Sequence, residues 1–167
     1  MNSNFETDRL LLEPLSMDMT LFIYELLNSK EWIRFIGDRN IDTLDDAEAY
    51  IEKILRTKQL QYWVVKLKDS KTPIGLVTFM KRTYLDHWDI GFAFLLRHAK
   101  KGYAFEAAST VLKAFQQLKE HPVVLATTVT DNTNSIKLLE KLGLRFDKKI
   151  KVEKEILSLY TSANSIE

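Results

Sequence analysis

The sequence predicts a mixed α/β domain in which one mostly antiparallel β-sheet is flanked by helices. Three observations lead to this fold class. Apolar residues recur with a period near 3.6 in residues 44–55 and 104–118, and runs rich in β-branched and aromatic residues fill residues 61–96. Strand and helix patterns then alternate along the rest of the chain. No linker-like tract interrupts the 167 residues, so we expect residues 1–167 to form a single domain.

The N-terminal third contains one predicted strand and two predicted helices. RLLLEPL at residues 9–15 has a strand pattern, and MTLFIYELLN after Asp18 places apolar residues on a broad helical face. The next helix has the clearest signals, because Thr43 and Asp46 have the spacing of a capping box and acidic residues fill the first turn. Its predicted buried stripe is Ala47, Tyr50, Ile51, Ile54 and Leu55.

The middle of the chain predicts strands, and the C-terminal part returns to alternation. QYWVVKLK and IGLVTFMKR flank the turn-rich DSKTP, which indicates an antiparallel hairpin, and WDIGFAFLL at residues 88–96 is a further strand. An amphipathic helix follows Gly102. The remaining predicted elements are a strand at VVLATTV, a helix at NTNSIKLLEKLG and two strands at LRFDKKIK and EKEILSLY.

Composition excludes several classes of protein. The 24 basic and 23 acidic residues leave a net charge of +1, which argues against binding to nucleic acid or to an anionic membrane. The absence of cysteine excludes thiol nucleophiles, disulfides and cysteine-ligated zinc. Neither a P-loop nor a dinucleotide-binding glycine motif occurs. MNSNFETDRL lacks the apolar core of a signal peptide and the apolar run at residues 90–96 is too short to span a bilayer, so we expect a cytoplasmic protein.

The stretch RHAKKGYAFEAAS connects a predicted strand to a predicted helix. A helix N-terminus presents unpaired N–H groups and the positive end of the helix dipole, and phosphates bind there. Gly102 permits close approach, Tyr103 and Ala104 supply the next N–H groups, and Lys100 and Lys101 add positive charge. The stretch therefore fits a diphosphate, and its composition equally fits a solvated basic turn.

The strand before this loop has two unlike faces. Asp89, Gly91 and Ala93 lie on one face, and bulky side chains lie on the other. Small residues leave room either for a ligand or for a neighbouring helix or backbone to lie close against the strand. A ligand beside the strand would reach its phosphates to the helix end.

Ordered motifs over nearly the whole chain identify a family. RLLLEPL, IRFIGDR with DDAEAYIEKIL, and PIGLVTF with WDIGFAF correspond to an opening strand, a two-helix insertion and a central hairpin. More specific are Arg97-x-x-Lys100-x-Gly102-Tyr103-Ala104 and the downstream VTDNTNSIKLLEKLGL. Together they resemble the GNAT superfamily of acetyl-CoA-dependent N-acetyltransferases, in particular the branch that contains the ribosomal-protein N-terminal alanine acetyltransferases.

The resemblance implies the acyl-CoA N-acyltransferase fold, with a splayed sheet, and acetyl-CoA as cosubstrate without a metal. Backbone groups of residues 94–96 would pair with pantetheine, and N–H groups of residues 101–104 would hold the pyrophosphate. The residues that it assigns to the cofactor are Phe94, Leu95, Leu96, Arg97, Lys100, Lys101, Gly102, Tyr103, Ala104, Asn132 and Ser135. The partner would be a primary amine, of a small molecule or a protein N-terminus, that attacks the thioester directly. A homodimer is compatible with the sequence.

Asp89 is the carboxylate that we expect to take the proton of the amine, because it precedes the small residues that would flank the acetyl group. It would need burial or a bridging water, and it alternatively fixes a loop or attracts a cationic substrate. Asp86 and His87 are weaker candidates for the same role. Ser135 would donate to the leaving sulfur or pack at its helix end, and Asn132 would contact pantetheine or cap the helix.

Two departures from the family pattern bear on activity. Lys100 stands where relatives usually have the first glycine of the loop, and Leu138 and Leu139 leave no counterpart for the tyrosine that many relatives use as the thiol acid. These departures motivate an alternative, a module that binds acyl-CoA and acts through protein contacts without turnover. Acceptor pockets in such folds are built by loops, so peptide N-termini, amino acids and polyamines all stay open as acceptors.

Overall fold

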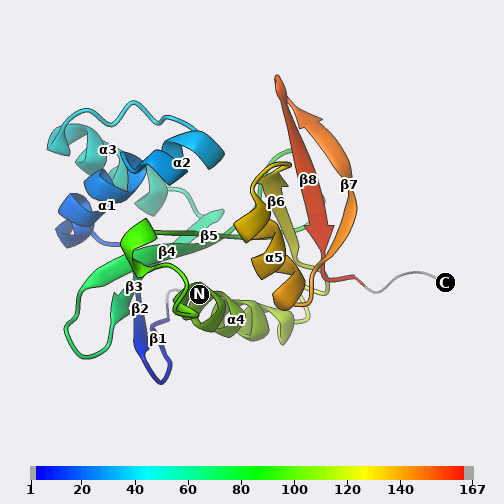
Figure 1. Ribbon diagram of the computed structural model, residues 1–167, viewed down its shortest axis with the longest axis horizontal. Helices are drawn as coiled ribbons and strands as arrows, with labels where there is room; N and C mark the ends of the chain where they lie inside the picture. Colours follow the sequence, from blue (N-terminus) through cyan, green and yellow to red (C-terminus); the bar gives the residue numbers. More distant parts are fainter. Residues whose placement is uncertain (1–2, 164–167) are drawn as a thin grey trace.

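The computed structural model describes residues 3–163 (Figure 1). The strands are β1 (Phe5–Glu6), β2 (Leu10–Pro14), β3 (Leu60–Leu67), β4 (Pro73–Met80), β5 (Asp89–Phe94), β6 (Leu125–Val129), β7 (Arg145–Val152) and β8 (Glu155–Thr161). The helices are η1 (Met17–Met19), α1 (Thr20–Leu27), α2 (Lys30–Phe35), α3 (Leu44–Leu55), η2 (Leu96–His98), α4 (Tyr103–Gln116) and α5 (Thr133–Lys141). The strands form one eight-stranded sheet in the order β1-β2-β3-β4-β5-β6-β8-β7. The predicted fold class, a mostly antiparallel sheet flanked by helices, is confirmed.

The two faces of the sheet carry different helices (Figure 1). α4 covers one face and buries the stripe that its period predicts, while α1, α2 and α3 cover the other face. Because side chains alternate along a strand, the neighbours Trp63 and Val64 of β3 belong to these two separate cores. Burial on both faces explains why β4 is almost entirely buried.

α3 begins with the capping box that the sequence predicts. The Thr43 hydroxyl accepts a hydrogen bond from the Asp46 N–H, and the Asp46 carboxylate accepts one from the Thr43 N–H. Both bonds satisfy donors that a helix end leaves unpaired, so the helix start is set locally. α3 then packs on the face of the sheet that β3, β4 and β5 expose to it.

The sheet opens between β5 and β6, which are its one parallel pair in the described chain. Their pairing consists of Asp89 opposite Leu125, and the Leu125 N–H donates to the Trp88 carbonyl at 2.9 Å. Beyond this point β5 continues against β4 and β6 continues against β8, so the two strands separate. We call this opening the V; α4 follows β5 on one side of it, and α5 follows β6 on the other (Figure 1).

Three elements differ from the sequence expectation. A short strand, β1, pairs with β2 ahead of the predicted first strand. α2 forms a helix of its own, because the Ser29 hydroxyl caps it by accepting from the Trp32 N–H at 3.3 Å. The strand predicted over residues 88–96 ends at Phe94, since the Leu95 carbonyl accepts from the His98 N–H at 3.0 Å and starts η2.

Within residues 3–163, no helix is long and apolar enough to cross a membrane.

Candidate active site

The loop between β5 and α4 ends at an uncapped helix N-terminus. Gly102 has a φ of 81°, in the left-handed region that glycine adopts readily, and no described side chain caps the helix. The Gly102 carbonyl accepts from the Glu106 N–H at 3.1 Å, which is the first helical bond. The N–H groups of Tyr103, Ala104 and Phe105 therefore lack helical partners and, with the helix dipole, form a seat for an anion.

Lys100 adopts a left-handed conformation two residues earlier, with a φ of 62°. Residues with a side chain disfavour this region by about 1 to 2 kcal/mol, which is a physical reason for the glycine that relatives usually carry here. Lys100 and Lys101 are both exposed. The loop thus keeps the backbone conformation of a glycine position and adds a charged side chain to it.

The edge of β5 that faces the V carries free backbone groups. The Leu95 N–H donates to the Ile74 carbonyl of β4 at 3.0 Å, whereas the Trp88 carbonyl accepts from β6. Because peptide groups alternate along a strand, those of Phe92 and Phe94 point toward the side on which β6 diverges. The Leu95 N–H and carbonyl are already used by β4 and η2, so of residues 94–96 Leu95 is not available to a ligand through its backbone. Phe92, which sequence reasoning missed, takes its place.

Arg97 and His98, in η2, differ in their contacts. Arg97 Nη1 donates to Glu25 Oε1 of α1 at 2.5 Å, so the guanidinium assigned to the cofactor is engaged with α1. His98 Nε2 is buried and has no partner among the described residues. Buried polar atoms are normally paired, so this nitrogen is the kind of group that a ligand satisfies. Burial also lowers the pKa of His98 below its ordinary value.

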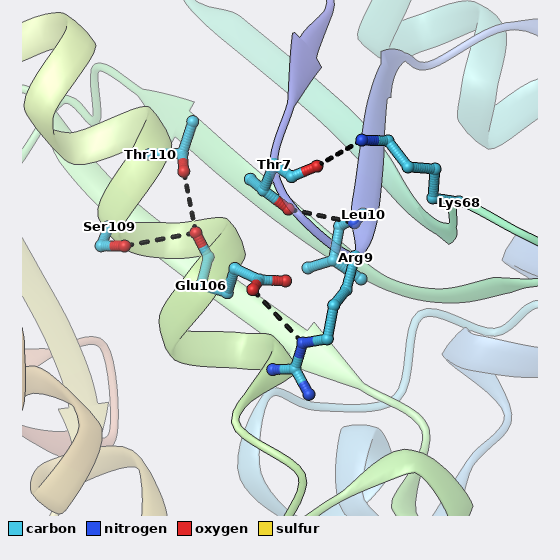
Figure 2. A network of polar contacts seen from close by, with 7 residues as sticks. All are labelled: Thr7, Arg9, Leu10, Lys68, Glu106, Ser109 and Thr110. Carbon is cyan, nitrogen blue, oxygen red and sulfur yellow. Dashed lines mark hydrogen bonds and ion pairs between the residues drawn. The ribbon is translucent and has the colours of Figure 1, made fainter.

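A basic residue that sequence reasoning did not assign to the site lies at the same helix end (Figure 2). Arg9 places its guanidinium 4.4 Å from the centroid of the Tyr103 ring, and its Nε lies 3.3 Å from Glu106 Oε1. A Cβ on Gly102 would approach Arg9 Nη2 to 3.3 Å. The contact joins positions 97 residues apart, so no local spacing could have indicated it.

The turn that carries Arg9 is braced by its neighbours (Figure 2). The Thr7 hydroxyl accepts from the Leu10 N–H at 3.0 Å, and Lys68 Nζ donates to the Thr7 carbonyl at 2.8 Å. These bonds connect the turn between β1 and β2 to the end of β3. The turn therefore holds Arg9 in place beside the N-terminus of α4.

Asp89 lies at the closed end of the V, where β5 and β6 pair. It is 1% exposed, and its Oδ2 lies 2.6 Å from Arg82 Nε. Burial raises the pKa of Asp89 from 3.8 to about 6, although the adjacent Arg82 opposes that rise. Sequence reasoning required burial for a base at this position and did not name Arg82, which stands in an irregular loop after β4.

Asn132 precedes the first turn of α5, and the sequence left open whether it caps this helix or contacts pantetheine. Its Oδ1 accepts from the Ser135 N–H at 3.2 Å, so Asn132 caps the helix. The Ser135 hydroxyl is half-buried and forms no hydrogen bond with any residue of the described range. It is available to donate to a group that enters the V.

The small residues on β5 serve packing. A Cβ on Gly91 would come within 2.6 Å of Thr78 Oγ1, so the Thr78 side chain fills that space. Ala93 packs against the core beneath α1, α2 and α3. Of the two interpretations open from the sequence, neighbouring protein atoms occupy this face, and the free surface of β5 is its backbone edge.

One ion pair crosses the open end of the V. Arg34 Nη2 of α2 lies 3.8 Å from Asp131 Oδ2, in the loop between β6 and α5. The side chains are 68% and 70% exposed. The pair connects the helical layer over β3 to β5 with the C-terminal half of the sheet.

The donors around the V fit a CoA thioester. Outward N–H groups and Arg9 suit phosphates, the free edge of β5 suits the amides of pantetheine, and a buried carboxyl and a free hydroxyl lie farther in. The described residues hold no group of three or more His, Cys, Asp or Glu side chains that could bind a metal. The arrangement is compatible with the CoA thioester that the sequence motifs imply.

Residues 9–145 match the acetyltransferase (GNAT) domain family. The chain belongs to this family, as its motifs predict. Among curated relatives, the uncharacterized N-acetyltransferase YnaD of Bacillus subtilis (strain 168) is 28% identical over 140 residues, which cover 83% of this chain and 81% of that protein.

Solved structures of acetyltransferases have the same fold. Ribosomal-protein-S5-alanine acetyltransferase from Vibrio fischeri superposes with a TM-score of 0.80 at 17% identity, covering 98% of each chain. Microcin C7 self immunity acetyltransferase MccE, solved in complex with acetyl-CoA and AMP, has a TM-score of 0.79 at 14% identity and covers 93% of this chain and 92% of its own. At these identities the likeness establishes the fold, and it includes the branch that the motifs resemble.

Proposed function

We propose that this protein transfers an acetyl group from acetyl-CoA to a primary amine. The observation that carries the proposal is the V, which opens a free strand edge between an uncapped helix N-terminus and a buried carboxyl. Membership of the GNAT family supports it, because the family is defined by this transfer. The acetyl-CoA bound by MccE, a protein of the same fold, supports the choice of cosubstrate.

In this proposal the cofactor is held mainly by main-chain groups. The N–H groups of Tyr103 to Phe105 bind the pyrophosphate, and Arg9 adds charge-assisted hydrogen bonds beside them. The backbone of Phe92 and Phe94 pairs with the amides of pantetheine. When bound, acetyl-CoA supplies an activated acetyl thioester.

In this proposal, side chains carry out the proton transfers of the reaction. An aliphatic amine is mostly protonated at neutral pH, so the neutral fraction is the form that attacks the thioester; Asp89 accepts the proton that this nitrogen loses, directly or through a water, as the new N–C bond forms. The C–S bond breaks in the same transfer, and the Ser135 hydroxyl donates a hydrogen bond to the departing thiolate. The products are an N-acetylated amine and free CoA, and the proton that the nitrogen gave to Asp89 passes to the thiolate through solvent.

One observation favours a second function. Asp89 is 1% exposed and bonded to Arg82, so an amine must displace water or side chains to reach it. A chain that kept the CoA site without an accessible base would bind acyl-CoA and act through protein contacts.

A single assay separates these functions. Release of free CoA from acetyl-CoA is followed with a panel of amines, amino acids and N-terminal peptides, alongside CoA-induced shifts in melting temperature. We expect saturable, amine-dependent release. Binding of CoA without release on any amine would favour the binding module, and no shift with CoA would contradict both.

A further inference from the structure

A second polar cluster lies next to Asp89, on the face of the sheet that α1, α2 and α3 cover. Strand register places Tyr62 of β3, Thr78 of β4 and Gly91 of β5 in one row across the sheet. Side chains in one row share a face, and Asp89 is on the same face two residues before Gly91. Tyr50 of α3 and Tyr62 both pack against the core on this face. The cluster therefore borders the closed end of the V.

Two arginines join these tyrosines. The Tyr50 hydroxyl interacts with Tyr62 and with Arg39, which comes from the loop between α2 and α3. Arg82 reaches the cluster from the loop after β4, bonds Asp89 at 2.6 Å and lies 5.9 Å from the Tyr84 ring centroid. The loop before α3, α3 itself, β3 and the loop after β4 thus bring two guanidinium groups and two phenol hydroxyls together.

The cluster carries more positive than negative charge. Arg82 is neutralised by Asp89, whereas Arg39 forms no ion pair with any residue between 3 and 163. Two acidic residues near Arg39 in the chain are used elsewhere. Asp38 accepts from the Asn40 N–H at 2.8 Å, and Asp46 is occupied by the capping box of α3. Among the described residues, the exposed guanidinium of Arg39 therefore has no ion-pair partner, and in this cluster it contacts the Tyr50 hydroxyl.

We infer that the acceptor is an amine that also carries a carboxylate, and that Arg39 and the Tyr50 hydroxyl bind this carboxylate while the Tyr62 hydroxyl donates to Tyr50 and orients it. A guanidinium binds a carboxylate through two parallel hydrogen bonds, and phenol hydroxyls donate further ones. Holding the acid end at Arg39 leaves the amino end beside Asp89. The inference rests on the proposed acetyl transfer and narrows its acceptor to the class of amino acids and related amino carboxylic acids.

The opposite preference, for a cationic acceptor, has weaker support. Glu25 and Glu31 line a groove of about 480 Å³ between α1, α2 and η2, but Glu25 is already paired with Arg97. A cationic acceptor would leave Arg39 unpaired and would meet Arg82 at Asp89. Equal or tighter binding of uncharged carboxamides is therefore the outcome that the experiment is designed to detect.

The experiment measures binding of product analogues rather than turnover. N-acetyl amino acids are titrated calorimetrically as free acids and as the matching carboxamides, with and without CoA, into wild type, Arg39→Gln, Arg39→Lys and Arg56→Gln. Arg56 is an exposed arginine at the end of α3 that pairs with Glu52, so it controls for loss of surface charge. Circular dichroism checks that each variant is folded.

We expect the best free acid to bind wild type and Arg56→Gln about tenfold or more tightly than its carboxamide, because a hydrogen bond to a charged group contributes about 1.5 to 3 kcal/mol. Arg39→Gln should abolish that preference, and Arg39→Lys should retain part of it. Equal or tighter binding of carboxamides, or no binding of either form, would overturn the inference. Failure of CoA to bind would instead contradict the proposed function, while the preference for acids is still measured on the CoA-free protein.

Discussion

The two halves of the site are built from different parts of the chain's chemistry. The cofactor half consists mostly of main-chain groups: the N–H groups at the start of α4 and the free edge of β5. The acceptor half consists of side chains, with Asp89 bonded to Arg82 and with Tyr50 beside Arg39. This difference determines which substitutions should affect each half. A change of side chain leaves main-chain donors in place unless it also alters the backbone conformation.

Asp89→Asn should break the acceptor half and leave the cofactor half intact. Asparagine has nearly the same shape but cannot accept a proton at this pH, and positioned bases contribute about 10²- to 10⁴-fold to rate. We expect kcat to fall by that order with an unchanged Kd for CoA. Stopped assays with the best amine and a CoA titration measure the two effects. An unchanged rate would remove Asp89 from the mechanism.

The pH profile tests the same group without a mutation. Burial raises the pKa of Asp89 to about 6, so the carboxylate is the minor form below that pH. Protonation of the amine alone gives log kcat/KM a slope of about 1 on the acidic side, and loss of the base adds a second unit below about pH 6. In Asp89→Asn the slope should stay near 1 throughout. A wild-type slope that does not steepen near pH 6 contradicts the role of Asp89.

Gly102→Val should break the cofactor half. Valine is strained at a φ of 81° and its Cβ would crowd Arg9 Nη2, so the α4 N-terminus must shift. Losing one or more bonds to a phosphate should weaken CoA binding by about 10- to 150-fold. The change appears as a loss of the CoA-induced shift in melting temperature.

Gly143→Val is the matched control for that substitution. Gly143 also has a positive φ, 91°, and a Cβ there would meet nothing within 4 Å. It should lower the free energy of unfolding through the same backbone strain while keeping the shift with CoA. Equal loss of the shift in both variants would mean that backbone strain, rather than the α4 site, is responsible.

Ser135→Ala should give a smaller effect, because it removes one neutral hydrogen bond. We expect kcat to fall by about two- to tenfold, with melting temperature unchanged because the hydroxyl has no partner within the described chain. Thr133→Ala, an exposed hydroxyl in the same helical turn, should change neither quantity. A fall in stability for Ser135→Ala alone would indicate a packing role.

Lys100→Gly should have the smallest effect on CoA binding, and it separates the contribution of the lysine side chain from that of the backbone conformation. Lys71 also has a left-handed φ, 61°, and is exposed, so Lys71→Gly reproduces the backbone change far along the chain. An exposed charge contributes at most about 1 kcal/mol, so we expect Lys100→Gly to weaken CoA binding by up to about fivefold at low salt. Lys71→Gly should leave the Kd unchanged. Tighter binding by Lys100→Gly would show that this lysine obstructs the phosphates.

The comparison also explains what could be predicted from the sequence. Part of the cofactor half follows from one continuous stretch, in which Phe94, Gly102 and Tyr103 occupy a strand end, a loop and a helix start in order. The sequence therefore predicts the order of these elements, whereas Arg9 and Phe92 were not predicted as part of the site. Arg9, Arg39 and Tyr62 reach the site only through strand order and through a loop of irregular conformation, which no spacing encodes. Leu95 shows the same limit for a single residue, since its hydrogen bonds to Ile74 and His98, and not its residue type, make its backbone unavailable to a ligand in the V.

The Arg34 and Asp131 pair has a consequence for access to the V. An exposed pair at 3.8 Å contributes at most about 1 kcal/mol, and such a difference changes the ratio of two states by only about fivefold. The entrance therefore alternates between bridged and unbridged forms of similar free energy. Exposed side chains exchange rotamers within picoseconds to nanoseconds, so we expect the opening of this pair to impose no slow step on a ligand that enters the V.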